Sequence, residues 1–240
     1  MSKIGHIAWK ELKGYFSSWM AYAILAGWML IGAMIWNQIT FDAATPGGFQ
    51  IAPLYGNLLT ILLFIAPLLT MRLLAEEKRE GSLEMLLTSP LTEWQVTLGK
   101  YFGALAFVAA MLLFTTHFPF FAFRYGSLDA GPVWGGYIAL FCVASAFIAW
   151  GLFCSSLSDS SVLAGFLAFG GLLISWLLGW LQEAAQSSDL AAFVVQFSVL
   201  THVQPMLRGA IDTKDLVFFA SLTWLFLFAT VRVLESRKWR

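Results

Sequence analysis

Apolar runs of about 20 residues recur along most of this 240-residue chain, and they restrict the fold more than any other feature. Hydrophobic residues make up 59% of the sequence and charged residues 12%, whereas soluble domains carry roughly 25% charged residues. Inside a bilayer, backbone polar groups must bond to each other, which leaves helices and closed barrels. Barrel strands alternate polar and apolar residues, and these runs do not. We therefore expect an all-α, polytopic membrane protein forming a single domain over residues 1–240.

The sequence predicts six membrane-spanning helices, and Pro67 predicts a kink in the second. The apolar segment Leu190–Leu200 is only 11 residues long, which is too short for a crossing. We expect Gln182–Asp215 to form one or two short re-entrant helices on the outer side, with Asp189 as a cap and Pro205 as the break between them. A plain amphipathic surface helix is the alternative. The six spans lie near Trp19–Gln38, Leu54–Leu74, Leu98–Phe123, Val133–Leu157, Val162–Leu181 and Leu216–Val233.

Positive charge is distributed unevenly over the two sides that these spans define. Of the 14 Lys and Arg residues, eleven precede span one, join spans two and three, or follow span six. The other three lie in connections on the opposite side. Because Lys and Arg accumulate in cytoplasmic loops, we predict that both termini and the connection between spans two and three are cytoplasmic.

The connection Arg72–Lys100, here called the elbow, holds nine of the chain's 28 formally charged residues. Gly81 supplies a break because glycine tolerates positive φ, and Ser82 can cap a second short helix. Pro90 ends that helix, and Thr92 begins a capping box for the next one. The pattern predicts a helix–turn–helix with an apolar face. It favours a docking surface for a soluble partner over a solvated loop.

Residues 1–18 predict an amphipathic helix lying on the inner membrane surface. Its apolar residues recur at helical spacing from Ile4 to Trp19. A simple extension of span one is the alternative interpretation. The polar face is made of Lys3, Lys10, Lys13 and Ser17.

The chain shows no pattern typical of an enzyme. It has no phosphate-binding G-x-x-x-x-G-K-[ST] motif and no metal-ligand spacing such as H-E-x-x-H. Cys142 and Cys154 fall in one apolar span and are expected to be packing residues. His117, as an ionisable residue inside a span, is a functional candidate. A neutral histidine bonded to a neighbouring backbone carbonyl is the interpretation we prefer.

Several segments resemble those of ABC-2-type transporter permeases. Glu76-Glu77, Glu80-Gly81-Ser82-Leu83-Glu84 and Leu86-Leu87-Thr88-Ser89-Pro90 are similar to their cytoplasmic signature. Trp9-Lys10-Glu11-Leu12, the six-span plan and a helical outer loop before the last span are similar too. The segments 208–212 and 231–237 look most like the gliding-motility-associated branch and its bacterial relatives.

This resemblance implies the membrane half of an exporter in the bacterial inner membrane, with no catalytic role and no cofactor on this chain. Each permease copy would dock a separate ATPase, carrying ATP and Mg, through a coupling helix in the elbow. The short turn Ser158–Ser160 would be a minor second contact. The residues at or near the ATPase contact would be Glu80, Gly81, Ser82, Glu84, Leu87, Pro90 and Thr92.

The resemblance also implies a dimer with an identical chain or a paralogue, formed through spans one and five. The small residues Gly171, Ser175 and Gly179 form a ridge on span five that permits close helix approach. Packing within one subunit explains the ridge equally well. The bilayer is a further expected partner, and nucleic acid is not. The alternative function is a membrane anchor or scaffold of a gliding or surface machine with no cargo of its own.

Overall fold

The computed structural model describes residues 3–42, 50–82, 91–125, 129–179 and 196–237. In these ranges the chain is helical apart from short connections, as predicted. The helices are α1 (Lys3–Phe16), α2 (Trp19–Asp42), α3 (Ala52–Thr70), α4 (Ala75–Arg79), α6 (Glu93–Thr115), α7 (His117–Tyr125), α8 (Ala130–Leu157), α9 (Ser161–Leu177), α11 (Val199–Leu207) and α12 (Thr213–Arg237).

Five helical stretches are long and apolar enough to cross a membrane, which confirms a polytopic membrane protein. They correspond to predicted spans one, two, three, four and six. The remaining predicted span, Val162–Leu181, contains α9, an apolar helix of 17 residues. Its crossing stays a prediction, because residues 180–195 lie outside the described ranges. The five stretches are Trp19–Thr40, Ala52–Arg79, Glu93–Arg124, Ala130–Leu157 and Thr213–Ser236.

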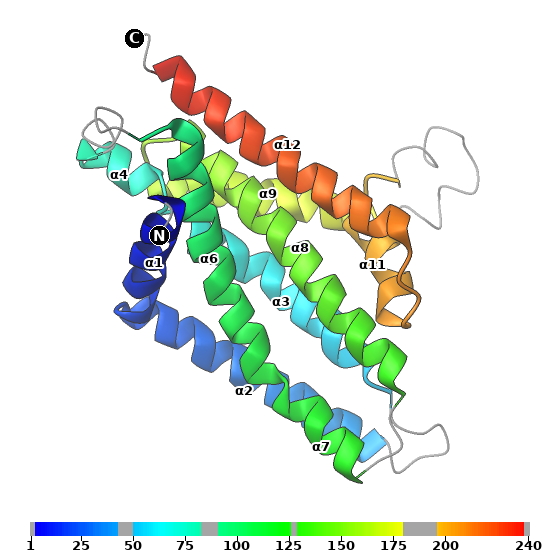
Figure 1. Cartoon of the computed structure of the whole chain (residues 1–240). Coiled ribbons are helices and arrows are strands. Elements are labelled where there is room, and N and C mark those ends of the chain that lie inside the picture. Colours follow the sequence, from blue (N-terminus) through cyan, green and yellow to red (C-terminus); the bar gives the residue numbers. More distant parts are fainter. Residues whose placement is uncertain (1–2, 43–49, 83–90, 126–128, 180–195, 238–240) are drawn as a thin grey trace.

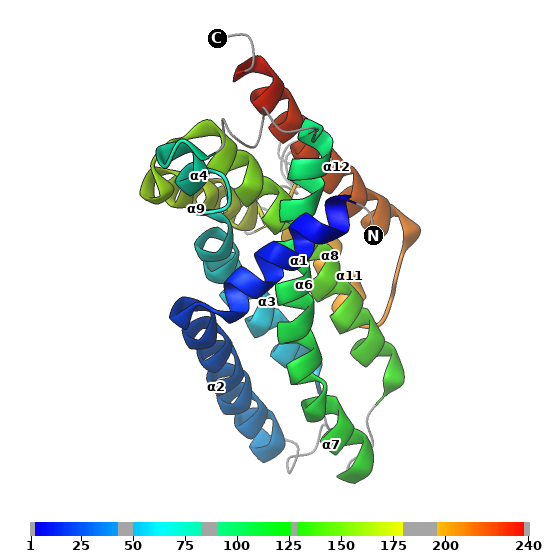
Figure 2. The same cartoon turned by 60° about the vertical axis from the view of Figure 1, so that its left-hand side comes forward.

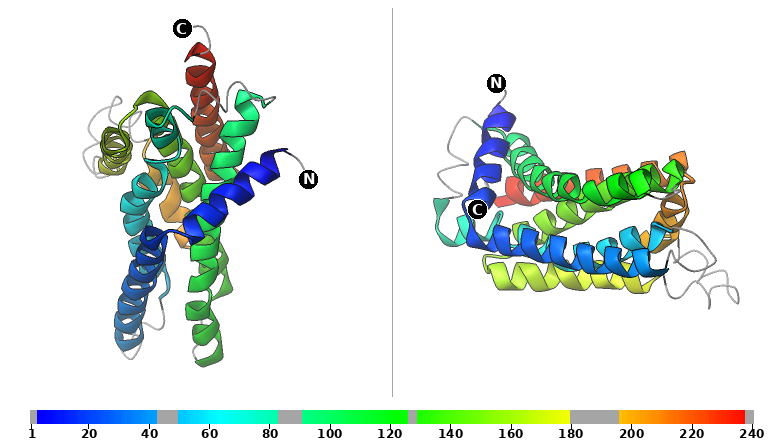
Figure 3. Two further views of the ribbon diagram at one scale, coloured as in Figure 1. Left: turned by 90° about the vertical axis from the view of Figure 1, so that its left-hand side faces the viewer. Right: turned by 90° about the horizontal axis from the view of Figure 1, so that it is seen from below.

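Helix α8 is the centre of the bundle, with α3, α6, α9, α11 and α12 packed around it (Figure 1). Viewed from below, α2 and α9 lie on the side of the bundle away from α6 and α12 (Figure 3). Two glycines of α8 let α3 approach closely. A Cβ at Gly136 would lie 2.2 Å from the Tyr55 ring, and one at Gly151 would lie 2.0 Å from Thr70 Oγ1.

Both ends of the described chain lie at the same end of the bundle as α4 (Figure 1). We call this the elbow end and define it by α1, α4 and the turn at residues 158–160. Helix α1 crosses α6 there instead of continuing α2 (Figure 2). The opposite end carries α7 and α11. Helix α1 is therefore separate from α2, and its predicted position on the inner membrane surface stays a prediction.

Two predicted spans are interrupted. Pro67 lies inside α3, which continues to Thr70, and a turn at residues 71–74 separates α3 from α4. The turn at residues 71–74 was not predicted from the sequence. In the third predicted span, α6 ends at Thr115 and α7 follows directly, with Thr116 between them.

The expected break at Pro205 is also wrong. Pro205 lies inside α11, which runs on to Leu207. Proline lacks the N–H that an interior helical residue donates, and α11 ends two residues after it. The chain turns instead at Gly209, whose φ of 87° suits glycine. The predicted cap Asp189 lies outside the described residues.

The close contact at Gly151 gives a test of the packing between α3 and α8. Gly151→Ala would place a methyl group against Thr70, and overpacking of this kind costs about 1–3 kcal/mol. We expect a lower midpoint of thermal unfolding in detergent. Gly170→Ala is the matched control, since a Cβ there meets no atom within 4 Å. Equal midpoints for the two variants would contradict this packing.

Candidate functional site

The candidate site is the elbow end, where α4 projects from the bundle and the chain turns. Helix α4 spans five residues and ends at Arg79, and the next residue, Glu80, is exposed. Gly81 follows with a φ of 71°, which confirms the predicted glycine break. The Ser82 hydroxyl donates to the Glu77 carbonyl oxygen at 3.2 Å. The helix that Ser82 was expected to cap lies outside the described residues.

The far side of the elbow is fixed by the predicted capping box. Thr92 Oγ1 accepts a hydrogen bond from the Gln95 backbone N–H, and Gln95 Oε1 accepts one from the Thr92 N–H, both at 3.3 Å. Trp94, in the first turn of α6, stacks on Trp224 of α12 with ring centroids 5.3 Å apart. The beginning of α6 is therefore held both locally and by another helix.

A buried ammonium group joins three helices at this end. Lys100 of α6 is only 2% exposed, and its Nζ lies 2.8 Å from Glu11 Oε1 of α1 and 2.7 Å from Glu77 Oε1 of α4. A charge removed from water needs opposite charges close by, and two carboxylates supply them. The cluster carries one negative charge in excess. It ties α4 to both α1 and α6.

Helix α1 lies against α6 through small residues and an aromatic stack. A Cβ at Gly99 would lie 2.6 Å from the Ile7 side chain, so α1 approaches closely there. Tyr15 stacks on Phe107 at 5.1 Å and donates its hydroxyl to the Leu69 carbonyl oxygen at 2.7 Å. Burial, and secondarily Glu11, raises the pKa of Tyr15 well above its usual value, so the hydroxyl stays a neutral donor.

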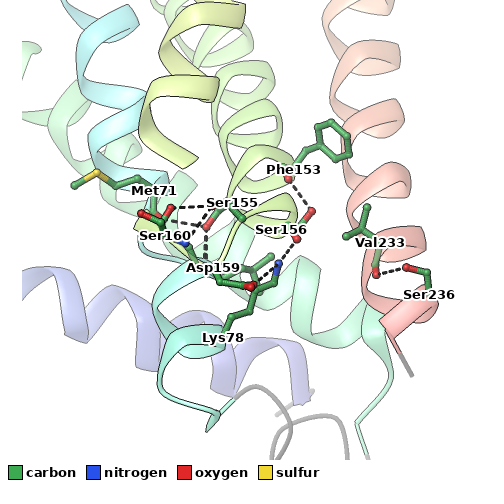
Figure 4. A network of polar contacts seen from close by, with 12 residues as sticks. Met71, Lys78, Phe153, Ser155, Ser156, Asp159, Ser160, Val233 and Ser236 are labelled. Atoms are coloured by element: carbon green, nitrogen blue, oxygen red, sulfur yellow. Dashed lines mark hydrogen bonds and ion pairs between the residues drawn. The ribbon is translucent and has the colours of Figure 1, made fainter. Parts of the chain in front are cut away.

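The turn between α3 and α4 is held by one side chain from α8. Ser155 Oγ accepts hydrogen bonds from the backbone N–H groups of Leu74 and Ala75, both at 3.0 Å. The same hydroxyl donates to the Met71 carbonyl oxygen at 3.2 Å. These are backbone groups that an uninterrupted helix would satisfy internally. Figure 4 shows the contact from close by.

Lys78 makes a second connection from α4 to the end of α8. Its side chain is 2% exposed, and the ammonium group donates to the Ser156 carbonyl oxygen. It also lies 3.9 Å from Asp159 Oδ1, in the turn before α9 (Figure 4). The short turn that was predicted as a minor second contact therefore lies beside α4. In that turn the Ser160 hydroxyl accepts from the Leu163 N–H and caps α9.

A cavity of about 320 Å³ opens between α1, the beginning of α2, the end of α3 and α4. Four carboxylates and two cations line it, namely Glu11, Glu76, Glu77 and Glu80 with Arg72 and Lys100. Its other wall is apolar and comes from α2 and α3. This end of the bundle therefore presents an acidic, hollowed surface rather than a flat one.

Residues 6–182 match the family model described as ABC-2 family transporter protein, which is well over half of the chain. The chain belongs to the ABC-2 transporter family. The match runs from α1 past the end of α9 and includes the whole elbow, whereas α11 and α12 follow it. The comparison with curated proteins finds no match. As an ABC-2 permease, the chain is a non-catalytic transmembrane component, and the family in general works with an ATPase partner.

Four of the seven residues expected at the ATPase contact of this permease lie in the described part of the elbow. These four are Glu80, Gly81, Ser82 and Thr92, of which all but Ser82 are exposed. The other three, Glu84, Leu87 and Pro90, lie outside the described ranges. Their role in binding a partner stays a prediction.

Two residues of the predicted small-residue ridge, Gly171 in α9 and Gly179 just after it, face other residues of this permease chain. A Cβ at Gly171 would lie 2.2 Å from the Trp150 ring of α8, and one at Gly179 would lie 2.7 Å from Leu200. These contacts favour packing within one subunit for those two residues. A dimer contact through Gly171, Ser175 and Gly179 stays a prediction.

His117 Nδ1 hydrogen-bonds to the Phe114 carbonyl oxygen at 2.6 Å, which agrees with the preferred interpretation of a histidine bonded to a neighbouring backbone carbonyl.

Sequence reasoning missed the polar residues that hold the elbow to the rest of the permease. Ser155 and Lys78 were not singled out, and Lys100 was taken only as a topology signal. One signal was available. The sequence has a serine pair at residues 155–156 inside an apolar run and a lysine directly before another. Polar groups in such apolar surroundings need hydrogen-bond or charge partners within the protein.

The Lys100 cluster yields a stability prediction for the permease. Lys100→Met leaves Glu11 and Glu77 without their counter-charge, and we expect the free energy of unfolding to fall by about 3 kcal/mol. Adding Glu77→Gln should recover part of that loss. Arg232→Met, which removes an exposed ion pair with Glu235, should cost less than about 1 kcal/mol. Denaturant unfolding in detergent measures all four proteins, and a stable Lys100→Met protein would contradict the charge argument.

Proposed function

We propose that the chain is the transmembrane permease subunit of an ATP-binding-cassette exporter in a bacterial inner membrane. In this proposal the elbow end and both termini face the cytoplasm, where a separate ATPase subunit docks on the elbow. The observation that carries the proposal is how α4 is held. A five-residue helix at the surface is joined by buried polar contacts to the beginning of α6 on one side and to the end of α8 on the other.

Such an arrangement suits the transmission of force. A helix this short is unstable in isolation, so its position depends on its contacts. Glu77 connects α4 to Lys100 of α6, and Lys78 connects it to the turn before α9. A partner that displaces α4 therefore displaces the ends of several long helices together. Movement of the spans as rigid bodies is a known class of transport transition.

The proposal includes a second permease copy or a paralogue. Large apolar side chains stand exposed along α2 and α9, among them Met34 at 65% and Phe166 at 70%. In a membrane such faces meet either lipid or another helix. We propose that the exposed apolar faces of α2 and α9 are where the second copy packs, and a contribution from the ridge at Gly171, Ser175 and Gly179 stays a prediction.

A membrane anchor for a gliding or surface machine is the second candidate. It is supported by the resemblance of segments 208–212 and 231–237 to the gliding-motility-associated branch, and these lie after the matched residues 6–182. The two candidates differ in their need for ATP. A scaffold supports assembly of its machine with a catalytically dead ATPase, and an exporter does not move cargo with one.

The docking proposal is tested by reversing the chemistry of the elbow. Glu84→Arg combined with Leu87→Asp should reduce co-purification of the ATPase at least tenfold, because it replaces an acidic and an apolar contact with opposite groups. Membrane insertion should not change. Asp212→Arg is the control, since it alters an exposed carboxylate at the other end of the bundle. Full ATPase binding by the double variant would refute the elbow as the docking site.

The orientation is tested by labelling single cysteines in a chain whose Cys142 and Cys154 are replaced by alanine. A membrane-impermeant maleimide applied outside sealed inverted vesicles should label Arg79→Cys and leave Asp212→Cys unlabelled. Intact spheroplasts should give the opposite result. Labelling of Arg79→Cys in spheroplasts would place the elbow outside the cell and overturn the proposal.

A further inference from the structure

The Ser155 hydroxyl occupies the gap between α3 and α4, and we propose that it is a positioning residue that sets the direction of the elbow. In this proposal the hydroxyl makes α4 move with α8 instead of with α3. The inference rests on the proposed function, because it concerns how the elbow passes a push to the spans. It assigns that task to one side chain.

The geometry shows a hydroxyl inserted into a helix ladder. In an uninterrupted helix the Ala75 N–H would donate to the Met71 carbonyl, four residues earlier. Here Ser155 Oγ stands between these two groups, accepting from Ala75 N at 3.0 Å and donating to Met71 O at 3.2 Å. It also accepts from Leu74 N at 3.0 Å. A side chain inserted in this way is an established cause of helix kinks.

All of the hydroxyl's bonding capacity is used at this point. A serine hydroxyl offers one donor and two acceptor lone pairs, and the three backbone groups at the break use all of them. Ser155 is fully buried, as are Leu74 and Ala75 around it. Without the hydroxyl, two N–H groups and one carbonyl would lose their partners in an apolar environment.

The least costly replacement is the direct bond from Ala75 N–H to Met71 O, and it would join α3 and α4 into one straight helix. A straightened segment carries Glu77 and Lys78 away from their present partners. The bend between α3 and α4 therefore depends on the Ser155 hydroxyl. The backbone connection to α3 alone would favour a different direction for α4.

A second link lies one turn further along α4. Lys78 reaches the Ser156 carbonyl oxygen and Asp159, so α4 is attached to the end of α8 and the turn before α9 at successive points (Figure 4). The attachment to α3, in contrast, passes through a turn. The parts that move together are therefore α4 and the α8–α9 corner.

Ser156 provides a matched control. It is the next residue of α8 and is equally buried, but its hydroxyl donates only to the Phe153 carbonyl of its own helix at 2.6 Å. Lys78 uses the Ser156 backbone carbonyl, which alanine retains. Ser156→Ala thus removes a buried serine hydroxyl without touching the break.

The first experiment uses the purified chain alone in nanodiscs. Spin labels on p-acetylphenylalanine at Arg79 and Val162, both exposed, report the distance between α4 and the beginning of α9. Ser155→Ala should shift that distance by about 5 Å, roughly one helical turn. Ser156→Ala and the hydroxyl-retaining Ser155→Thr should not. An unchanged distance in Ser155→Ala overturns the inference.

The second experiment uses the complex with its co-purified ATPase. Between the nucleotide-free state and the state trapped with Mg, ATP and vanadate, the 79–162 distance should stay constant in the wild type and in Ser156→Ala. It should change in the Ser155→Ala complex. A distance that changes in the wild type overturns the inference.

The two experiments also separate this inference from the proposed function. If no ATPase co-purifies with the wild type, the proposed function fails, and the first experiment still decides whether Ser155 sets the bend. If Ser155→Ala does not fold, Ser155→Cys replaces it, because a thiol is a weak donor and acceptor. The same shift is expected for the cysteine variant, and its absence counts against the inference.

Discussion

The bundle depends on one constraint, which is that backbone polar groups away from water must find partners within the protein. Long helices meet it by themselves, and the interruptions are where other groups must help. At residues 71–75 the help comes from Ser155 on a neighbouring helix. At the end of α11 a glycine with positive φ lets the Gly209 and Ala210 N–H groups reach carbonyls of the last turn. Both of these departures from a straight rod thus have an identifiable hydrogen-bond donor or acceptor.

Buried charged side chains need partners even more than backbone groups do, because an unpaired buried charge costs more free energy than an unpaired amide. Lys100 and Lys78 are both 2% exposed, and they solve the problem differently. Lys100 is paired with two carboxylates, and Lys78 is held by a backbone carbonyl with an exposed carboxylate further off. Both solutions involve α4 or its immediate contacts. The shortest helix of the described chain is therefore among the most firmly connected.

This concentration of polar contacts gives the family membership a physical meaning. An ABC-2 permease makes no catalytic contribution of its own, so any energy from ATP must enter through a contact surface. The elbow end offers such a surface, with exposed Glu80 and Gly81 at its tip and buried links behind them. If the proposed docking is correct, the links through Glu77 and Lys78 divide a push between α6 with α1 and the α8–α9 corner. That division would let one small displacement reorient spans on both sides of the bundle.

Features that depend on neighbours in the chain were determined by the sequence itself. These include the five long apolar helices, the Gly81 break and the capping box of Thr92 with Gln95, because hydrophobic length, glycine conformation and capping act within a few residues. The tertiary structure decided what depends on which helices become adjacent. The insertion of Ser155 between Met71 and Ala75 required α8 to lie beside the end of α3, and the sharing of Lys100 required α1 to cross α6. Chain positions more than 75 residues apart meet at each of these points in space, and no local pattern specifies such a meeting.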